Sequence, residues 1–594
     1  MLKRILFILF LIIIAILLLV NPNFKKIAAG IAILIFGMIS LEEGFKVFTK
    51  GPLQLIMKKA TDKLYKSISA GAIVTTLIQS SSLVSVITIS FISAGLINLT
   101  GGLGLIFGAN IGSTTTAWLI AAFGLKFNIA SLAFPMTVFG VVFLLQKNET
   151  LKGVGNVLVG LGFFFLGIHY MKEGFDVFKD SINLIDYAVS GFWGVLIFTG
   201  LGMVITTILQ SSGATLALIL TALAAGQISY ENALALAIGA NIGTTITAVL
   251  SSLSSNIAGK RLAGAHFIFN VVTGLLTVIL IFPFANFVNY LANLFGISPT
   301  NFVLKLALFH TLFNVFGVLL MIPFMKKLEE LLTRIIKDTK QKDIDDPKYL
   351  NEAVLKFPSS TILALINESK YVYINAVFEI VAHGLNIHRD DIKSQEKIKK
   401  IIKRSRQDFN TNIDDLYLKK VKTIYGEIIR YAATAQNDLN LNKDQNNIIT
   451  KIKIANRKMV EIIKDVKEIN KNVSLSFTLD NTYLTREYNS FRKKLTEVLR
   501  FIYLYQAEQH HEKYAQKLMH FKKEAMENIE QNNKSIDTLI RKNLITSEMA
   551  SSLFNDYLNL NDIIKKLIEV AELLYDSNDT LFENGHFIND KKST

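Results

Sequence analysis

The chain has 594 residues, of which 51% are hydrophobic and 19% are charged, with a formal net charge of +15 and no cysteine. Soluble domains carry about a quarter of charged residues, so an ordinary soluble protein is excluded. The lack of cysteine excludes disulfides and thiolate metal sites, and basic residues that alternate with acidic ones give no sign of a nucleic-acid ligand.

The charges divide the chain into a membrane part and a polar part. No Asp, Glu, Lys or Arg occurs in residues 67–125 or 187–230, whereas charges are dense after about residue 326. Uncharged apolar segments of about 20 residues can span a bilayer. We therefore expect four regions: an N-terminal span and connection (1–26), a membrane domain (27–325), a linker (326–355) and a helical domain (356–594).

The membrane-spanning helices can be placed from the apolar runs. Residues 4–21 are interpreted as an uncleaved first span, with Lys3 and Arg4 on the cytoplasmic side. The basic run from Met325 places the C-terminal domain in the cytoplasm as well, which requires an even number of crossings. The candidate crossings are 4–21, 27–48, 101–123, 128–146, 154–172, 231–253, 262–286 and 302–325.

The membrane part contains an internal duplication. The motif Gln-Ser-Ser begins at Gln79 and again at Gln210, and GANIGSTTTA (from Gly108) returns as GANIGTTITA (from Gly239), both with an offset of 131 residues. A third pair, FGMISLEEGFKVF and LGIHYMKEGFDVF, has an offset of 130. A shared offset indicates a duplicated unit, with repeat 1 over about 30–145 and repeat 2 over about 160–285.

Loop charges predict how the repeats are oriented. Residues 42–66 carry six Lys and three acidic residues, whereas the equivalent residues 172–186 carry two Lys and four acidic ones. Positive loops favour the cytoplasmic side, so these loops are expected on opposite sides of the membrane. The repeats are then inverted, as in many secondary transporters. The alternative is that the loop charges drifted without any inversion.

Two long uncharged stretches, 68–97 and 192–226, carry the Gln-Ser-Ser motif near the middle, and each is predicted to be a helical hairpin or broken helix. Polar groups in the bilayer are costly unless they are paired or face water. Small polar residues also allow close helix packing, but adjacent hydroxyls suit an unwound binding segment better. The candidate binding residues are Thr75, Thr76, Gln79, Ser80, Ser81, Ser82, Thr206, Thr207, Gln210, Ser211 and Ser212.

These residue types favour an anion bound together with cations. Uncharged oxygens are ligands for hard cations such as Na⁺, and the amides of helix N-termini hold anions. The only Arg between residues 27 and 325 is Arg261, which we place in a loop. An oxyanion would therefore depend on hydroxyls, amides and a co-bound cation that lowers the cost of moving it into the membrane.

Further polar residues lie in the GANIG blocks and in two His-x-x-x-Asn pairs. The first set either lines the substrate path or forms packing faces: Asn110, Thr114, Thr115, Asn241, Thr244 and Thr245. The pairs His266/Asn270 and His310/Asn314 are interpreted as interhelical hydrogen-bonding groups, with proton relay as the alternative. No Walker, HExxH or GxSxG motif occurs, so neither an enzyme nor a cofactor is expected.

Paired QSSS-type motifs, each followed by a GANIGTT-like block, with HxxFN further on, resemble the sodium-dependent phosphate cotransporter family over about residues 27–325. The resemblance implies Na⁺-coupled symport of inorganic phosphate across the cytoplasmic membrane by alternating access, with both ligands at residues 79–82 and 210–212. Gly213 stands where a third Ser is usual, which removes one hydroxyl. A sensor that signals through its tail without transport, and a symporter of another oxyanion, remain as alternatives.

The polar tail is predicted to be a bundle of amphipathic helices. From Leu553 to Leu574 apolar residues alternate by four and three positions, which is typical of a bundle helix. This stretch resembles a PhoU-like domain, which implies regulation through a cytoplasmic partner. Such domains can hold metals through ExxxD motifs, but the tail has only the isolated pairs Glu461/Asp465 and Glu572/Asp576. We therefore expect no metal beyond transported Na⁺.

Overall fold

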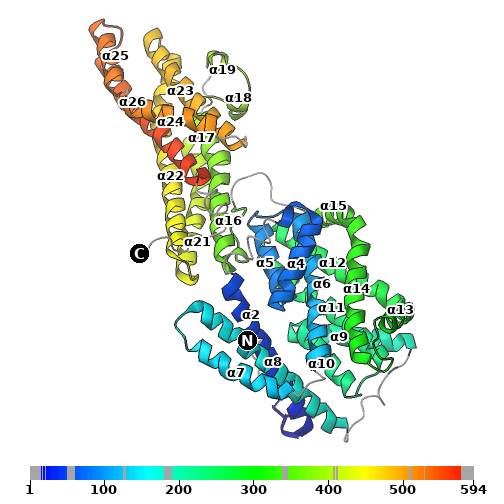
Figure 1. Cartoon of the computed structure of the whole chain (residues 1–594). Helices are drawn as coiled ribbons and strands as arrows, with labels where there is room; N and C mark the ends of the chain where they lie inside the picture. Colours follow the sequence, from blue (N-terminus) through cyan, green and yellow to red (C-terminus); the bar gives the residue numbers. More distant parts are fainter. Residues whose placement is uncertain are drawn as a thin grey trace. The chain divides into compact units, whose positions relative to one another are not determined.

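The computed structural model describes residues 12, 15, 16, 18–20, 22–49, 60–124, 129–179, 189, 191–337, 346–405, 409, 412–507, 512–527 and 529–576. These ranges contain helices and no strand, which confirms the all-α class. Most of the predicted first span, 4–21, lies outside them. The chain forms two compact units, the first reaching Lys337 and the second containing the described residues from Asp346 onward (Figure 1).

Seven helices within the described ranges are long and apolar enough to cross a membrane, which confirms a polytopic membrane protein. They are Phe24–Phe45, Leu99–Ala122, Glu149–Val177, Gly191–Leu209, Tyr230–Ser252, Ile257–Ile279 and Phe302–Ile335. The predicted crossing 128–146 is the shorter helix α7 (Ile129–Leu144), which contains Pro135. The predicted crossing 262–286 is wrong at its end, because α12 (Ile257–Ile279) stops before α13 (Ile281–Leu294) begins.

The third pair of repeated blocks forms two helices, α2 (Pro22–Thr49) and α8 (Glu149–Lys179), which pack against each other (Figure 1). Glycines seven residues apart make the contact, and they meet as Gly30 with Gly167, Gly37 with Gly160 and Gly44 with Gly153. Small residues allow membrane helices this close approach. Since rising numbers on α2 meet falling numbers on α8, the two helices run antiparallel.

The repeats also produce two matching sets of helices: α4 (Leu64–Ile78), α5 (Ser81–Ser93) and α6 (Leu99–Leu119), then α9 (Gly191–Leu209), α10 (Ser212–Ala224) and α11 (Tyr230–Ser252). Equivalent glycines make equivalent contacts. A Cβ added to Gly108 of α6 would collide with the carbonyl of Ile68 on α4. One added to Gly239 of α11 would collide with the carbonyl of Thr199 on α9. The duplication seen in the sequence is therefore present in the packing.

The last helices of the first unit change two expectations. Residues at the start of the predicted linker form the amphipathic helix α15 (Met325–Ile335), which follows α14 (Phe302–Met321) and packs on α12. Arg261 lies in α12 and not in a loop. Its guanidinium donates to the carbonyl of Ile336, 3.0 Å from Nη2. A cation at this position compensates the partial negative charge of the α15 C-terminus.

The second unit is a bundle of helices built around one apolar core. Its α-helices are α16 (Pro358–Val372), α17 (Phe378–Gly384), α18 (Arg389–Lys393), α19 (Ile398–Arg404), α20 (Ile413–Tyr417), α21 (Thr423–Asp438), α22 (Lys443–Thr478), α23 (Thr482–Ala507), α24 (Glu512–Glu527), α25 (Ile529–Arg541) and α26 (Ser547–Ala571). The predicted seam is buried: Leu553, Leu560, Leu567 and Leu574 are each at most 1% exposed.

A buried arginine ties two helix ends together in this unit. Arg492 of α23 is fully buried. It donates to the carbonyl of Leu385, 2.8 Å from Nε, and to the carbonyl of Ser405. These two residues follow the ends of α17 and α19. Helix C-termini carry partial negative charge and unpaired carbonyls, so the guanidinium satisfies both ends.

One of the two ExxxD pairs of the tail is occupied by a lysine. Nζ of Lys566 lies 2.6 Å from Asp562, 3.0 Å from Asp465 and 3.4 Å from Glu461. Burial lowers the pKa of Lys566, but the hydrogen bonds and charges of the carboxylates raise that pKa above its ordinary value. The ammonium group thus supplies the positive charge that this acidic cluster requires. That the tail holds no metal stays a prediction.

Candidate functional site

Both Gln-Ser-Ser motifs break a helix at the same position, which confirms the predicted breaks. α4 ends before Gln79 and α9 ends before Gln210. Gln79 has a φ of 58° and Gln210 a φ of 53°, in the left-handed region that ends helices. This conformation costs a residue with a Cβ about 1–2 kcal/mol. Its occurrence at both equivalent glutamines marks a constrained feature of the fold.

The first Ser of each motif starts the next helix. Ser80 and Ser211 have extended backbones, and their hydroxyls accept hydrogen bonds from the amides of Leu83 (3.2 Å) and Ala214 (3.1 Å). Serine is a preferred residue at this capping position. α5 and α10 have 13 residues each, so they are about 20 Å long. A bilayer core is about 30 Å thick, so neither helix is long enough to cross it alone.

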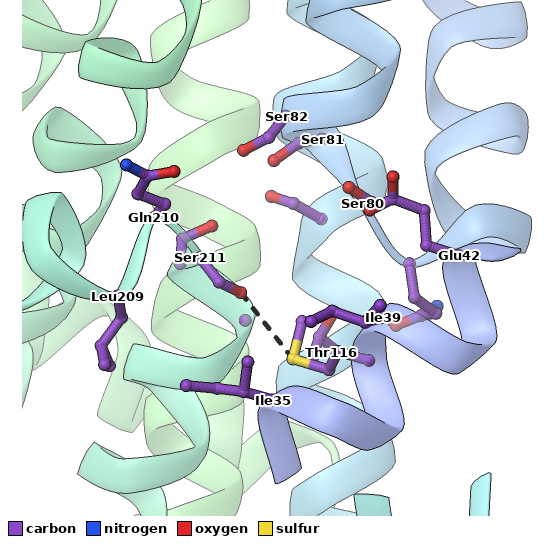
Figure 2. Close-up of a pocket in the computed structure, with 15 residues that line it drawn as sticks. Ile35, Ile39, Glu42, Ser80, Ser81, Ser82, Thr116, Leu209, Gln210 and Ser211 are labelled. Carbon is purple, nitrogen blue, oxygen red and sulfur yellow. Dashed lines mark hydrogen bonds between the residues drawn. The ribbon is translucent and has the colours of Figure 1, made fainter. Parts of the chain in front are cut away.

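The two motifs meet at one cavity of about 260 Å³ (Figure 2). We call residues 79–82 the first half-site and residues 210–213 the second half-site. Every predicted residue of the two motifs lines the cavity, together with residues of α2 and α6. The lining residues are Ile35, Met38, Ile39, Glu42, Gln79, Ser80, Ser81, Ser82, Ser113, Thr116, Leu209, Gln210, Ser211, Ser212 and Gly213.

Two helix N-termini at the cavity can hold an anion without any cationic side chain. None of the described residues that line it is basic. The first amides of a helix have no partner within the helix, and the helix dipole places partial positive charge there. The N-termini of both α5 and α10 reach the cavity. Amides and hydroxyls from two directions can therefore surround an oxyanion.

The glutamine of the first half-site is held by α6. Nε2 of Gln79 donates to Oγ1 of Thr115 (3.1 Å) and to the carbonyl of Thr76 (2.5 Å). Oε1 of Gln79 accepts from Oγ1 of Thr116 at 2.8 Å. Both ends of the amide are thus fixed, and α6 supplies two of the three partners.

The glutamine of the second half-site is not held in this way. Gln210 is exposed, and its side chain makes no hydrogen bond within the described ranges. The repeat offset places Ile246 where the first repeat has Thr115, so one hydroxyl partner is missing. The second half-site instead contacts α2, because Oγ of Ser211 donates to Sδ of Met38 at 3.7 Å (Figure 2).

The predicted threonines that flank the motifs do not line the cavity. Thr75 is fully buried, and the carbonyl of Thr76 receives the bond from Gln79. Oγ1 of Thr206 donates to Thr215 at 2.9 Å, which joins α9 to α10 across the break. Oγ1 of Thr207 donates to the carbonyl of Met203 at 2.8 Å. These residues support the break, and their role in binding stays a prediction.

The GANIG blocks reach the cavity through Ser113 and Thr116, two polar residues of the first block that are not among the six path-lining candidates. Asn110 donates to the carbonyl of Ile106 at 2.9 Å. Asn241 donates to Asn314 (2.7 Å) and lies 3.3 Å from Nε2 of His310, the interhelical bonding expected there. The hydroxyls of three further candidates bond to backbone carbonyls: Thr114, Thr244 and Thr245. Lining of the path by this set stays a prediction.

The sequence reasoning missed the contribution of α2. Ile35, Met38, Ile39 and Glu42 line the cavity. Their spacing of three and four residues places them on one helix face. For Met38, Ile39 and Glu42 that spacing was visible within the block FGMISLEEGFKVF, which we used only as a marker of the repeat. Since Glu42 is the only charged residue among the described lining residues, it is the main addition to the site.

Comparison with known proteins supplies the family. Residues 33–173 and 194–327 match the family described as Na⁺/Pi-cotransporter. An uncharacterised Bacillus subtilis protein, YqeW, is 30% identical over 316 residues, which are 52% of this chain and 94% of YqeW. A Salmonella typhimurium protein with the provisional name inorganic phosphate export protein YjbB is 28% identical over 363 residues, 60% of this chain and 64% of that protein.

The namesake from Escherichia coli strain K12 is 27% identical over 380 residues, 63% of this chain and 67% of its own length. This chain therefore spans about two thirds of the relatives that carry the export name. No solved structure matches the chain. The family match covers most of both repeats and the whole cavity. The chain therefore belongs to the Na⁺/Pi-cotransporter family, a family of transporters and not of enzymes.

Proposed function

We propose that the protein moves inorganic phosphate across the cytoplasmic membrane by Na⁺-coupled symport. The observation that carries this proposal is the meeting of two serine-capped helix N-termini, one from each repeat, at one cavity within the membrane domain. The family name and the export names of the relatives agree with phosphate as the substrate.

The chemistry of the cavity accounts for both ligands. The amides of α5 and α10 and the serine hydroxyls bind the phosphate oxygens. The negative charge of a phosphate dianion exceeds the partial positive charge of two helix N-termini. Bound Na⁺ neutralises the remaining negative charge and lowers the free-energy cost of moving the phosphate through the membrane. A water occupies about 30 Å³ of liquid volume, so a cavity of about 260 Å³ has room for phosphate and Na⁺ together.

The duplicated fold supplies a mechanism for alternating access. The antiparallel contact of α2 with α8, the equivalent helices of the two repeats, supports an inverted topology. Rocking of one repeat against the other would then open the cavity to each side in turn. We place the N-terminus and the PhoU-like tail in the cytoplasm, where the tail regulates transport through a partner protein.

Uptake by proteoliposomes tests the function. Radiolabelled phosphate should accumulate with an inward Na⁺ gradient and should leave loaded vesicles when that gradient is reversed. Equal uptake with and without Na⁺ would rule out the coupling. Phosphate binding without any transport would identify a sensor, and better transport of sulfate or arsenate would identify another oxyanion as the substrate.

Two serines test the site without loss of a helix cap. Ser81 and Ser212 are the first residues of α5 and α10, and they line the cavity but do not cap a helix. Replacing either by Ala should lower phosphate uptake about tenfold or more, because each hydrogen bond to a charged group contributes about 1.5–3 kcal/mol. Ser90→Ala on α5, away from the cavity, is the matched control. Normal uptake in S81A and S212A would remove the site assignment.

A further inference from the structure

Two helices outside the cavity carry the same pair of buried residues. α12 has His266 and Asn270, and α14 has His310 and Asn314, four positions apart in each helix. All four side chains are at most 2% exposed. In both helices Nδ2 of the asparagine donates to the carbonyl of the histidine, at 3.2 Å in α12 and 2.8 Å in α14. Oδ1 of each asparagine remains to accept a hydrogen bond from another helix.

Only one of the two asparagines receives that bond. Nδ2 of Asn241, in the GANIG block of α11, donates to Oδ1 of Asn314 at 2.7 Å. Asn110 is the equivalent of Asn241 on α6, but its Nδ2 donates to the carbonyl of Ile106 in its own helix at 2.9 Å. Oδ1 of Asn270 is buried and has no hydrogen-bond partner within the described ranges. A buried acceptor without a donor is costly, so its presence in a native fold requires an explanation.

The packing of α6 on α12 fixes the relative level of their residues (Figure 1). A Cβ added to Gly102 of α6 would lie 3.2 Å from Leu262 of α12. Further along both helices, the rings of Phe107 and Phe269 have centroids 4.7 Å apart. Since the residue numbers rise together, α6 and α12 run parallel at this contact.

Asn110 and Asn270 follow this phenylalanine contact by three residues and one residue. At a rise of 1.5 Å per residue, their levels differ by about 3 Å. We propose that Asn110 donates to Asn270 when the transporter changes state, while Asn241 leaves Asn314 and returns to a carbonyl of its own helix. We call Asn110 and Asn270 the first pair, and Asn241 and Asn314 the second pair. This inference rests on the proposed function, because it requires alternating access.

The exchange keeps the number of hydrogen bonds constant. In the described state the second pair is bonded, and the donor of the first pair bonds to the carbonyl of Ile106. The residue of α11 equivalent to Ile106 is Ala237, one turn before Asn241, and its carbonyl takes the donor in the other state. No charge moves, and each state leaves one buried acceptor unpaired. The two states can therefore be close in free energy, so that both are populated, and each pair stabilises one of them.

Labelling of a single cysteine in the cavity tests the inference on the full chain. The protein has no cysteine, so Ile35→Cys in the cavity lining provides a unique thiol. A membrane-impermeant maleimide is added to right-side-out and to inside-out membrane vesicles. The ratio of the two labelling rates measures to which side the cavity opens. Asn314→Ala removes the bond of the described state and Asn270→Ala that of the other state, so the two variants should shift this ratio in opposite directions. Each shift should be about fivefold, the order expected for one net hydrogen bond.

Two further variants control for a general effect of losing a buried amide. Asn289 lies on α13, and its Oδ1 is likewise buried without a partner in the described part of the chain. Asn289→Ala should leave the labelling ratio unchanged. Asn110→Ala should shift the ratio in the same direction as N270A. The double variant N110A/N270A should shift it no further than either single variant, because both remove the same bond.

Any result other than opposite shifts in N270A and N314A would overturn the inference, since a merely structural role does not distinguish the two sides of the membrane. If an alanine variant does not fold, Ser at the same position replaces it, because a serine hydroxyl can bond to a carbonyl of its own helix; the expected direction is the same. Labelling of the I35C protein from one side only would overturn alternating access together with the inference. Labelling from both sides without opposite shifts would overturn the pairing alone and leave the proposed function intact.

Discussion

The two half-sites share one backbone design but differ in their side-chain contacts. In both, a glutamine in the left-handed region ends one helix and a serine caps the next. In the first half-site, Gln79 is fixed by Thr115 and Thr116, and a carboxylate lies nearby. In the second half-site, Gln210 has no such partners within the described residues, and Gly213 replaces the third serine.

This difference shows that the duplication preserves the frame, by which we mean the broken helices and their backbone packing, more strictly than the side chains that act as ligands. A transporter with alternating access needs two halves that can exchange conformations, which requires matching backbones. Bound ions need a particular set of oxygens, which one half can supply. We therefore expect equivalent substitutions in the frame to have equal effects in both repeats, and equivalent substitutions among the ligands to have unequal ones.

The largest effect is expected where the halves are most alike. Gly108→Ala and Gly239→Ala both place a Cβ against a backbone carbonyl of the neighbouring helix. Backbone cannot yield as a flexible side chain can, so each should destabilise the protein by about 3 kcal/mol, the upper end for overpacking. Thermal melting of the purified chain in detergent measures the loss.

Gly200→Ala is the control for these variants, because an added Cβ there meets nothing within 4 Å. It should be neutral or stabilise α9 by up to about 1 kcal/mol. A large loss in G108A with none in G239A would show that the frame itself is asymmetric.

Substitution of the two equivalent glutamines should lower stability by different amounts in the two half-sites. Gln79→Ala removes an amide that takes part in three hydrogen bonds, so it should cost about 2–3 kcal/mol of stability at about 1 kcal/mol for each bond. Gln210→Ala loses no such bond and should cost less than about 0.5 kcal/mol. The left-handed backbone is the same at both positions, so it cancels in the comparison. Equal shifts in melting temperature would contradict the described difference.

Much of this frame could be predicted from the sequence, because it depends on local chemistry. The shared offset of 131 residues revealed the duplication, and the uncharged stretches with Gln-Ser-Ser revealed the broken helices. The duplication is read directly from self-similarity at a fixed offset, and the broken helices follow from the rule that polar backbone and side chains in a membrane must be satisfied. The position of each break between Gln and Ser follows from the capping preference of serine.

The residues of other helices that meet the two motifs in the folded protein could not be predicted in the same way. Glu42 is about 40 residues from the first motif, and no local rule states which face of α2 meets the cavity. The GANIG block contains several hydroxyls, but only helix rotation decides that Ser113 and Thr116 line the cavity while Thr114 is buried and does not line it. Arg261 was assigned to a loop because charge was taken as the end of a span.

A smaller effect on stability is expected when Gln210 is given the hydroxyl partner that it lacks. Ile246→Thr introduces into α11 the hydroxyl that Thr115 provides on α6. In this variant the new hydroxyl should bond to Gln210, with a coupling of about 1 kcal/mol. A double-mutant cycle with Q210A, read by thermal melting, measures that coupling. The same cycle at Thr115 and Gln79 is the positive control, and a coupling near zero at Gln210 would show that the two halves differ in more than one side chain.

The smallest effect concerns the residue that differs between the two motifs. A Cβ at Gly213 would lie 2.9 Å from Cε of Met38, the flexible end of a side chain, and 3.5 Å from Thr116. Gly213→Ser should therefore fold normally and add a hydroxyl to the cavity. Because serine is a better helix residue than glycine, stability should rise by about 0.5 kcal/mol.

Gly213→Ala separates the hydroxyl from the added Cβ. Both variants displace Met38 equally, so a difference between them in the Na⁺ or phosphate dependence of uptake reports the hydroxyl alone. We expect G213S to bind phosphate up to about threefold more tightly than G213A, the effect of one modest hydrogen bond. A shift in Na⁺ dependence that is specific to G213S would place a cation at the second half-site, and the added hydroxyl would then be a ligand of that cation and not of phosphate.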